Sequence, residues 1–237
     1  MSRLIITIFI VLFFSCEGKN NIEPVEFIEY YRDGVIKSKG LFYKDSLKKG
    51  RWTYYDSKGF VKSIEDYKIV KNNSILNQQW MFNQKGDTIY EKSKFYDLIL
   101  NKDTLEVNEL LKAVIYMPAS LFKNRESEIL VYLPIRDEEN FNKDFSNEKN
   151  VRLDTFHNLS KDVVENQKLL EGFNPKHVVI FGKYYLTPGK KVVRGIIVEY
   201  YFQNDESSEG GQMRKENKTY FEKEIFVKDS LKGNVPN

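Results

Sequence analysis

Residues 50–63 read GRWTYYDSKGFVKS, and their pattern predicts one complete β-hairpin from which the fold of the N-terminal half follows. Its first half is rich in aromatic side chains, as in a β-strand. Asp56-Ser57-Lys58-Gly59 has the composition of a tight turn, with Gly59 at the position that requires a positive φ. The residues after Gly59 are predicted to return as a second strand. An isolated hairpin is marginally stable in water, so this one must pack on similar neighbours.

The same unit recurs on both sides of this stretch. Residues 30–38 read YYRDGVIKS, and Gly34 aligns with Gly59 at an offset of 25 positions. A weaker third copy, WMFNQKG at residues 80–86, places Gly86 at 27 positions beyond Gly59. A period in the twenties indicates an array of one small structural unit per repeat. The side chains expected to fill the spine of this sheet are Trp52, Tyr54 and Trp80.

Residues 50–59 resemble the MORN-repeat family in its variant form, which has a Gly-x-Trp-x-x-Tyr-x-x-x-Gly-like spacing. The resemblance extends over residues 25–97 and implies an extended antiparallel sheet of successive hairpins. Members of the family are described as membrane-associated scaffolds, as protein-interaction modules and, in one bacterial branch, as antitoxin-like proteins. None of these roles has a residue signature that transfers to this chain. The aromatic stripe can therefore be the spine of the sheet or a binding groove, and the spine is the commoner case.

The N-terminal segment has the features of a secretory signal. Arg3 supplies a positive charge, the apolar run of residues 4–14 follows, and the small residue Ser15 precedes Cys16, the only cysteine. A helix of this length is too short to span a bilayer, which requires about 18 apolar residues or more. We therefore expect a signal peptide over residues 1–15 and a flexible tether over residues 16–24.

Residues 13–16, FFSC, resemble the lipobox of bacterial lipoproteins, although Phe13 stands where that family favours leucine. The resemblance implies cleavage before Cys16 and acylation of its thiol and new amino group, for example with palmitate. It also gives a use to a lone cysteine, which cannot form an internal disulfide. The alternative is a secretory peptide that is cleaved elsewhere, or an uncleaved anchor with a free Cys16.

The rest of the chain carries a second all-β pattern. Residues 110–117 and 128–133 read as strands ending at Pro118 and Pro134, and residues 151–156 and 220–227 alternate in the same way. The clearest hairpin is expected to run from residues 177–186 through a Pro188-Gly189 turn to residues 192–202. A short helix over residues 160–170 and a polar loop over residues 203–218 are also expected.

Together these patterns predict an all-β protein. Residues 25–100 are expected to form MORN-like hairpin repeats, and residues 104–230 an Ig-like β-sandwich with six or more short strands. The formal net charge of +3 falls to +2 when the signal peptide with Arg3 is removed. This balance lacks the clustered basic face of a nucleic-acid-binding protein. The short basic groups at residues 48–51 and 190–194 are expected to protect sheet edges.

Catalytic motifs are absent from the sequence, which has no GxSxG, HExxH, phosphate-binding glycine loop or EF-hand loop. His157 and His177 are its only histidines, too few for a zinc site. Ser160, His157 and Asp162 could form a triad on paper, but nothing marks an activated nucleophile. We therefore expect no catalytic residue, no cofactor and no metal site, and Cys16 is the only site residue assigned.

Two acidic groups remain as alternatives. Residues 137–139, DEE, and residues 205–206, DE, could supply the paired carboxylates of a glycosidase or a weak calcium site. In a chain with 34 acidic residues such pairs arise by chance, and solvated loop charge is the default reading.

The sequence therefore predicts a non-enzymatic bacterial envelope lipoprotein, anchored by Cys16, that binds another envelope protein or acts as a scaffold. The outer membrane is favoured over the inner one, and the oligomeric state is left open. The alternatives are an antitoxin or immunity-like protein, which would form a tight one-to-one complex, and a hydrolase of envelope polysaccharide, which would need a deep acidic cleft.

Overall fold

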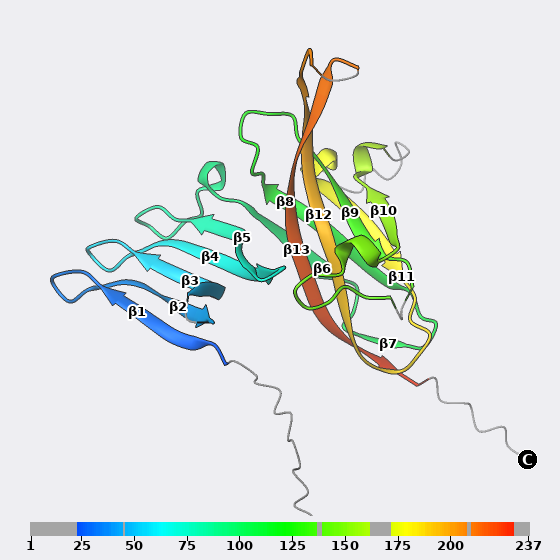
Figure 1. Cartoon of the computed structure of the whole chain (residues 1–237), viewed down its shortest axis with the longest axis horizontal. Coiled ribbons are helices and arrows are strands. Elements are labelled where there is room, and N and C mark those ends of the chain that lie inside the picture. Colours follow the sequence, from blue (N-terminus) through cyan, green and yellow to red (C-terminus); the bar gives the residue numbers. More distant parts are fainter. Residues whose placement is uncertain (1–22, 45, 137–138, 162–171, 208–209, 230–237) are drawn as a thin grey trace, which may run out of the picture.

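The computed structural model describes residues 23–44, 46–136, 139–161, 172–207 and 210–229. The expected signal peptide and Cys16 lie outside these residues. In the described parts the only helices are single 3-10 turns, and all other regular structure is β (Figure 1). The expectation of an all-β chain, with a hairpin sheet followed by further sheets, is confirmed.

The first sheet is a five-stranded antiparallel meander, in which each strand pairs with the next one along the chain. Its strands are β1 (Val25–Tyr30), β2 (Ile36–Tyr43), β3 (Leu47–Tyr55), β4 (Val61–Val70) and β5 (Asn73–Met81). The repeated turns have the same geometry: Gly34, Gly59 and Gly86 have φ of 85°, 83° and 86°. Each of these glycines donates its backbone N–H to the carbonyl three residues earlier, at 3.0 Å. The turn residues expected from the sequence are thus the ones that reverse the chain.

Trp52 forms the centre of a small aromatic core on one face of this sheet, and only 1% of its surface is exposed. Its ring lies over Gly40, where an added Cβ would come within 2.3 Å of the indole. Phe27 and Phe42 pack beside it, with ring centroids 5.8 and 4.8 Å away. The Lys48 ammonium lies 4.7 Å from the Trp52 ring centroid. Of the three side chains expected to fill the spine, Trp52 is buried, whereas Tyr54 and Trp80 are only partly buried.

Two further sheets form the sandwich (Figure 1). One has the order β10-β9-β12-β13-β7, with strands β10 (Leu153–His157), β9 (Glu128–Pro134), β12 (Gly189–Asn204), β13 (Gln212–Lys228) and β7 (Thr104–Glu106). The other has the order β11-β8-β6, with strands β11 (Val178–Lys183), β8 (Leu111–Ala119) and β6 (Phe95–Leu100). Because β6 pairs with β8, the hairpin sheet ends at β5, and the expected hairpin range 25–100 includes one strand of the sandwich.

The main hydrophobic core lies between these two sheets. It includes alternating residues of β8, such as Leu111, Ala113 and Ile115, and of β9, such as Ile129 and Val131. A second cluster covers the opposite face of the β10-β9-β12-β13-β7 sheet, with side chains from β9 and the loop after it, from β12 and β13, and from the end of β4. Its buried members are Val70, Leu130, Phe141, Phe145, Ile196, Val198, Tyr200 and Tyr220.

Two expectations about the C-terminal half are wrong. The strands before and after the Pro188-Gly189 turn do not form a hairpin: β11 pairs with β8, whereas β12 pairs with β9 and β13. The connection crosses from one sheet to the other, which alternation cannot reveal because both strands bury one face in the same core. The expected polar loop over residues 203–218 is also shorter, since Gln212 already begins β13. These polar residues pair with the end of β12 in a ribbon that extends beyond the sandwich (Figure 1).

Asn77 of β5 joins the hairpin sheet to the sandwich. It occupies a β-bulge between the pairs Asp66–Gln78 and Tyr67–Leu76, and its side chain is fully buried. Its amide donates to the carbonyl of Tyr220 at 2.9 Å and accepts from the Tyr220 N–H at 2.7 Å. The side chain thereby pairs with the backbone of β13 as another strand would. A bulge can re-aim a side chain in this way.

Candidate functional site

Glu199 on β12 has a fully buried carboxylate, which makes it the first candidate for a catalytic group in the described fold. It accepts hydrogen bonds from Ser127 Oγ at 2.8 Å, from the backbone N–H of Leu121 at 3.0 Å and from that of Phe122 at 3.3 Å. The hydroxyl of Ser120 donates to it as well. Four donors offset the cost of burying this charge.

His177 lies beside this carboxylate, with its Nε2 atom 3.1 Å from Ser127 Oγ and 3.0 Å from the carbonyl oxygen of Ser127. The single hydroxyl proton of Ser127 is directed to Glu199, so the imidazole must be the donor at Nε2. Burial lowers the pKa of His177, against the opposing attraction of Glu199, and this favours the neutral ring. An imidazole that donates to a serine cannot accept that serine's proton. The pair therefore lacks the arrangement of a nucleophile and its base.

The network instead fixes the loop between β8 and β9. Ser127 is only 2% exposed, which leaves no access for a substrate. In the same loop, Lys123 donates from Nζ to the carbonyls of Ser93 at 2.6 Å and Tyr90 at 3.0 Å. These two residues belong to the connection that leads from the hairpin sheet into β6. Glu199 thus holds a loop that in turn fastens the two halves of the protein together.

Lys94, in the same connection, is a buried lysine with a perturbed pKa. Burial lowers the pKa of its ammonium to about 8, although the attraction of Glu199 opposes the shift. Sequence reasoning missed this cluster. One signal was available, since Glu199 is the only charged residue within the otherwise apolar run GIIVEYYF at residues 195–202.

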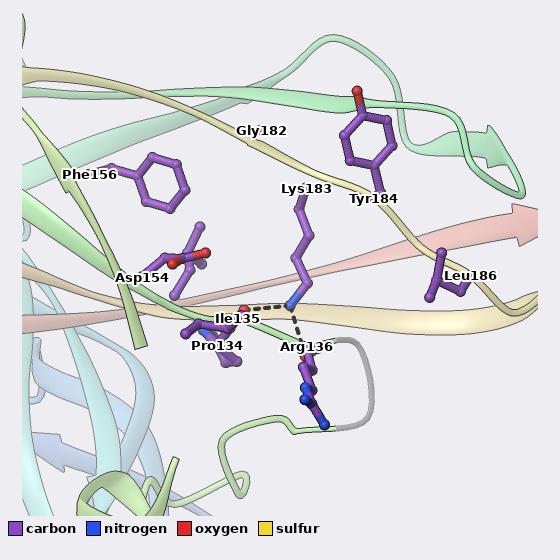
Figure 2. A pocket seen from close by; sticks show the side chains of 10 residues that line it. Pro134, Ile135, Arg136, Asp154, Phe156, Gly182, Lys183, Tyr184 and Leu186 are labelled. Atoms are coloured by element: carbon purple, nitrogen blue, oxygen red, sulfur yellow. Dashed lines mark hydrogen bonds between the residues drawn. The ribbon is translucent and has the colours of Figure 1, made fainter. Parts of the chain in front are cut away.

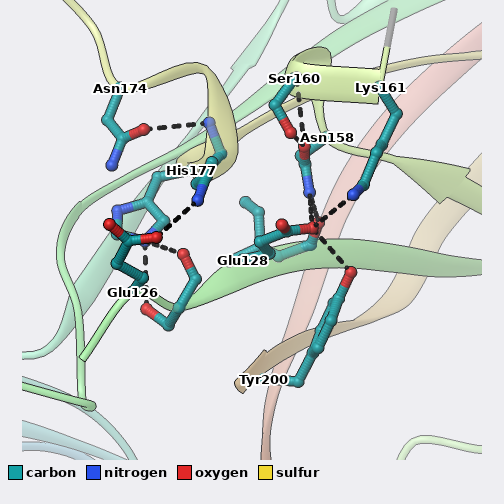
Figure 3. Close-up of polar contacts among 11 residues, drawn as sticks. Glu126, Glu128, Asn158, Ser160, Lys161, Asn174, His177 and Tyr200 are labelled. Carbon is teal, nitrogen blue, oxygen red and sulfur yellow. Dashed lines mark hydrogen bonds and ion pairs between the residues drawn. The ribbon is translucent and has the colours of Figure 1, made fainter. Parts of the chain in front are cut away.

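The structure does not bring together a catalytic triad of Ser160, His157 and Asp162 in its described residues. Ser160 donates its hydroxyl to Asn158 Oδ1, as Figure 3 shows, and its backbone N–H bonds to the same oxygen at 3.1 Å. His157 is exposed on β10, and Asp162 lies outside the described residues. The expected helix over residues 160–170 also lies almost wholly outside them. Asn158 therefore caps the short 3-10 turn of Leu159–Lys161, and Ser160 is its donor.

Glu128, close to this turn, is a second carboxylate saturated by donors (Figure 3). It accepts from Tyr200 Oη at 2.9 Å and from Asn158 Nδ2 at 3.3 Å, and it pairs with Lys161 at 3.4 Å. Burial acts to raise the pKa of Glu128, but these three partners outweigh it and lower the value. Burial and the bond to Glu128 raise the pKa of Tyr200 to about 12. A carboxylate held ionised by such partners is a poor general acid at neutral pH.

Of the acidic groups suggested as alternatives, Glu139 and Asp205 have partners within the fold. Glu139 pairs with Arg152, while Asp137 and Glu138 lie outside the described residues. Asp205 accepts from the N–H of Ser207 in its own exposed turn. Across the described ranges, no three His, Cys, Asp or Glu side chains gather to hold a metal ion. Nor does any helix in those ranges have the length and apolar character to cross a membrane.

Basic side chains at residues 48–51 and 190–194 also make contacts within the fold. Lys190 pairs with Glu224 at 2.8 Å and Arg194 with Glu222 at 3.1 Å, each across the β12–β13 pair. Lys48 lies over the Trp52 ring. Both basic groups lie on interior strands of their sheets, β3 and β12, and not on the edge strands expected from the sequence.

An open hollow of about 510 Å³ remains at one side of the sandwich (Figure 2). It lies between β10 and β11, which are edge strands of the two facing sheets. Its floor reaches the main core through Leu133 and Phe156, and the Phe156 ring lies 5.8 Å from that of Phe181. Its rim carries apolar side chains with unusual exposure, including Tyr184 at 57% and Leu186 at 60%.

Lys183 crosses this hollow from one sheet to the other. Its Nζ donates to the carbonyls of Pro134 at 3.0 Å and Arg136 at 3.4 Å, as Figure 2 shows. Arg136 and Asp154 are the other charged residues of the lining, so cations outnumber carboxylates there. The site therefore combines an apolar floor, an apolar rim, a positive balance and two neighbouring strand edges.

A wider cleft of about 730 Å³ separates the hairpin sheet from the sandwich. The charged residues that line it are of both signs, and Lys68 forms an ion pair with Glu222 at 3.2 Å. The remaining charged residues are Glu23, Lys49, Asp66, Lys143 and Asp144. This mixed lining favours no single class of ligand, and the hollow at the sandwich edge is the stronger candidate site.

Comparison with known proteins adds no assignment: no protein-family model matches this chain, and neither a curated protein nor a solved structure gives a significant match.

Proposed function

We propose that this protein is a non-enzymatic lipoprotein of a bacterial envelope that is anchored through Cys16 and binds an extended segment of another envelope protein. The apolar run followed by Ser15-Cys16 supports the anchor. The MORN-like repeats support an interaction role by resemblance. The buried polar clusters support the absence of catalysis, because the Ser127–His177 pair is closed to substrate and has the wrong proton arrangement.

The hollow between β10 and β11 is the observation that carries the binding proposal. Edge strands present unpaired backbone groups, and an extended peptide can add to such an edge while its side chains enter pockets beside it. Here the pocket has an apolar floor at Phe156 and an exposed apolar rim at Tyr184 and Leu186. Arg136 would favour a partner with a carboxylate next to its apolar anchor. The chemistry of the partner is thus an apolar, acidic, extended segment.

The test is in-cell crosslinking and capture of the tagged, anchored protein. Leu186→Asp places a charge in the rim of the hollow, whereas Phe60→Asp is the matched control, because Phe60 is 54% exposed on a turn of the hairpin sheet. We expect a stoichiometric envelope partner that is lost with Leu186→Asp and with Cys16→Ala and kept with Phe60→Asp. Capture that survives Leu186→Asp would place the binding surface elsewhere. Hydrolysis of envelope glycan by the purified protein would contradict the proposal as a whole.

A further inference from the structure

We propose that two copies of this protein pair through strand β1 and thereby join their hairpin sheets into one continuous antiparallel sheet. Strand β1 lies at the opposite end of the molecule from the hollow (Figure 1), so this pairing does not depend on what the hollow binds. In the described structure, β1 pairs with β2 on one side and with no strand on the other.

The exposed side chains of β1 are unusual for a free edge. Val25 and Phe27 point to one face of the sheet and are 64% and 38% exposed, while Ile28 points to the other and is 39% exposed. Proteins usually protect an edge strand with unpaired charges, proline or a short length. Here β1 has two charged residues, Glu26 and Glu29, and the second is already paired with Lys37 of the neighbouring strand at 2.7 Å. An edge with these properties is suited to strand addition.

The sequence of β1 is complementary to itself, and this argues for a second copy as the partner. In an antiparallel pair across a two-fold axis, with Phe27 opposite Phe27, Val25 lies opposite Glu29 and Glu26 lies opposite Ile28. No carboxylates then face each other, a contact that would be destabilising. Centring the pair on Glu26 would place the two Glu26 side chains together. Centring it on Ile28 would draw in the bulge at Glu29/Tyr30.

The aromatic core of the hairpin sheet supports the same register. Phe27 is the outermost ring of the row that includes Phe42 and Trp52, with centroid distances of 5.0 and 5.8 Å. In the described structure no strand pairs with the free side of β1, and Phe27 stays 38% exposed. A second Phe27 opposite it would continue the row across the two-fold axis, and aromatic cross-strand pairs are among the favourable ones.

The contact is small, since one strand pair buries less than the roughly 1,200–2,000 Å² of a stable interface. We therefore expect a reversible dimer in solution. Two chains anchored in one membrane through the proposed lipid would associate more readily, because tethering raises their effective concentration. A tether over residues 16–24 reaches at most about 30 Å, which keeps β1 near the membrane surface.

Cysteine crosslinking tests the register, on a chain of residues 17–237 that keeps every described residue and lacks Cys16. Opposite residues of an antiparallel pair have Cα atoms about 4.5–5.5 Å apart, within the range of a disulfide. Phe27→Cys should therefore give a crosslinked dimer under mild oxidation. Ile28→Cys is the matched control, with nearly equal exposure but more than about 7 Å between its two copies. Equal crosslinking of both variants, or of neither, would overturn the proposal.

A charge pair at Val25 provides an independent measurement without cysteine. Val25→Glu places a carboxylate opposite Glu29 at both ends of the two-fold pair, whereas Val25→Lys places an ammonium there. By sedimentation equilibrium we expect Val25→Glu to weaken the dimer about two- to thirty-fold, and Val25→Lys to leave it unchanged or tighter. Val25 is mostly exposed, so both variants should fold. A monomeric parent protein at all concentrations, or equal effects of the two substitutions, would contradict the pairing.

Discussion

At the scale of single residues, the buried polar side chains of this protein hydrogen-bond to neighbouring segments and hold them in place. Two of them are fully buried: Glu199 on β12 accepts hydrogen bonds from the loop between β8 and β9, and Asn77 lies where the hairpin sheet meets the sandwich. Each carries a desolvation cost, which hydrogen bonds repay when every donor and acceptor has a partner. Such groups resemble catalytic residues in their burial, but they differ from them in lacking access to a substrate.

Glu199→Gln should destabilise the fold without changing its architecture. The carboxylate accepts from four donors, and the amide nitrogen of glutamine would face some of those donors with its own hydrogens. We expect a loss of about 1–3 kcal/mol in the free energy of unfolding, measured by urea denaturation. Glu206→Gln, in an exposed turn, is the control and should change stability little. Equal stability of the two variants would show that the network contributes nothing.

Lys94 should give the protein a stability that increases with pH in the mildly alkaline range. Its pKa is about 8 in the folded state against an ordinary value of 10.5, so the unfolded chain binds more protons between these values. The free energy of unfolding should therefore rise by about 2 kcal/mol between about pH 7.5 and about pH 9.5.

The Lys94→Met variant isolates this contribution. It lacks the titrating group, so the stability difference between parent and variant should change over the same pH interval. Parallel urea-denaturation profiles for the two proteins across that interval would contradict the assignment.

At the scale of elements, the hairpins are locally encoded, but their attachment to the sandwich is not. The three glycine turns reverse the chain with the same φ, and each depends only on the residues within it. The junction depends on one bulge, at which Asn77 leaves the regular alternation and reaches β13. The Asn77 side chain thus makes the two hydrogen bonds to the backbone of β13 that a neighbouring strand would otherwise make.

Asn77→Ala should loosen this junction. It leaves the N–H and the carbonyl of Tyr220 without their buried partner, and we expect a loss of about 2–4 kcal/mol in the free energy of unfolding. Asn73→Ala, on the same strand but exposed, is the control. Thermal or urea denaturation measures the free energy of unfolding of both variants. A loss for Asn77→Ala no larger than that for Asn73→Ala would contradict a role of Asn77 in joining the two parts.

At the scale of the whole molecule, the two parts differ in how deeply their backbone is buried. The sandwich encloses its core between two sheets, whereas β1 and β2 make their main contacts within their own layer. Local opening costs least where few apolar contacts must be broken. The protein thus combines a well-buried C-terminal half with an N-terminal sheet that has less protection.

Native-state amide hydrogen exchange should reveal this gradient. We expect the slowest exchange in β9 and in the paired centres of β12 and β13, and the fastest among strand residues in β1 and β2. Protection of β1 should increase with protein concentration if the proposed dimer forms. Uniform protection across both halves would contradict the gradient.

The sequence determined the elements of this protein that depend on neighbouring residues. The alternation, the repeated glycine turns and the burial of Trp52 followed from local pattern, because a strand face and a turn are specified within a few residues. The tertiary structure decided which strands pair. It separated β11 from β12, paired the polar residues 212–218 with β12, and buried Glu199 among donors from a loop about 75 residues away in sequence. Pairing between distant segments depends on matching surfaces across the whole fold, and a linear pattern does not contain that information.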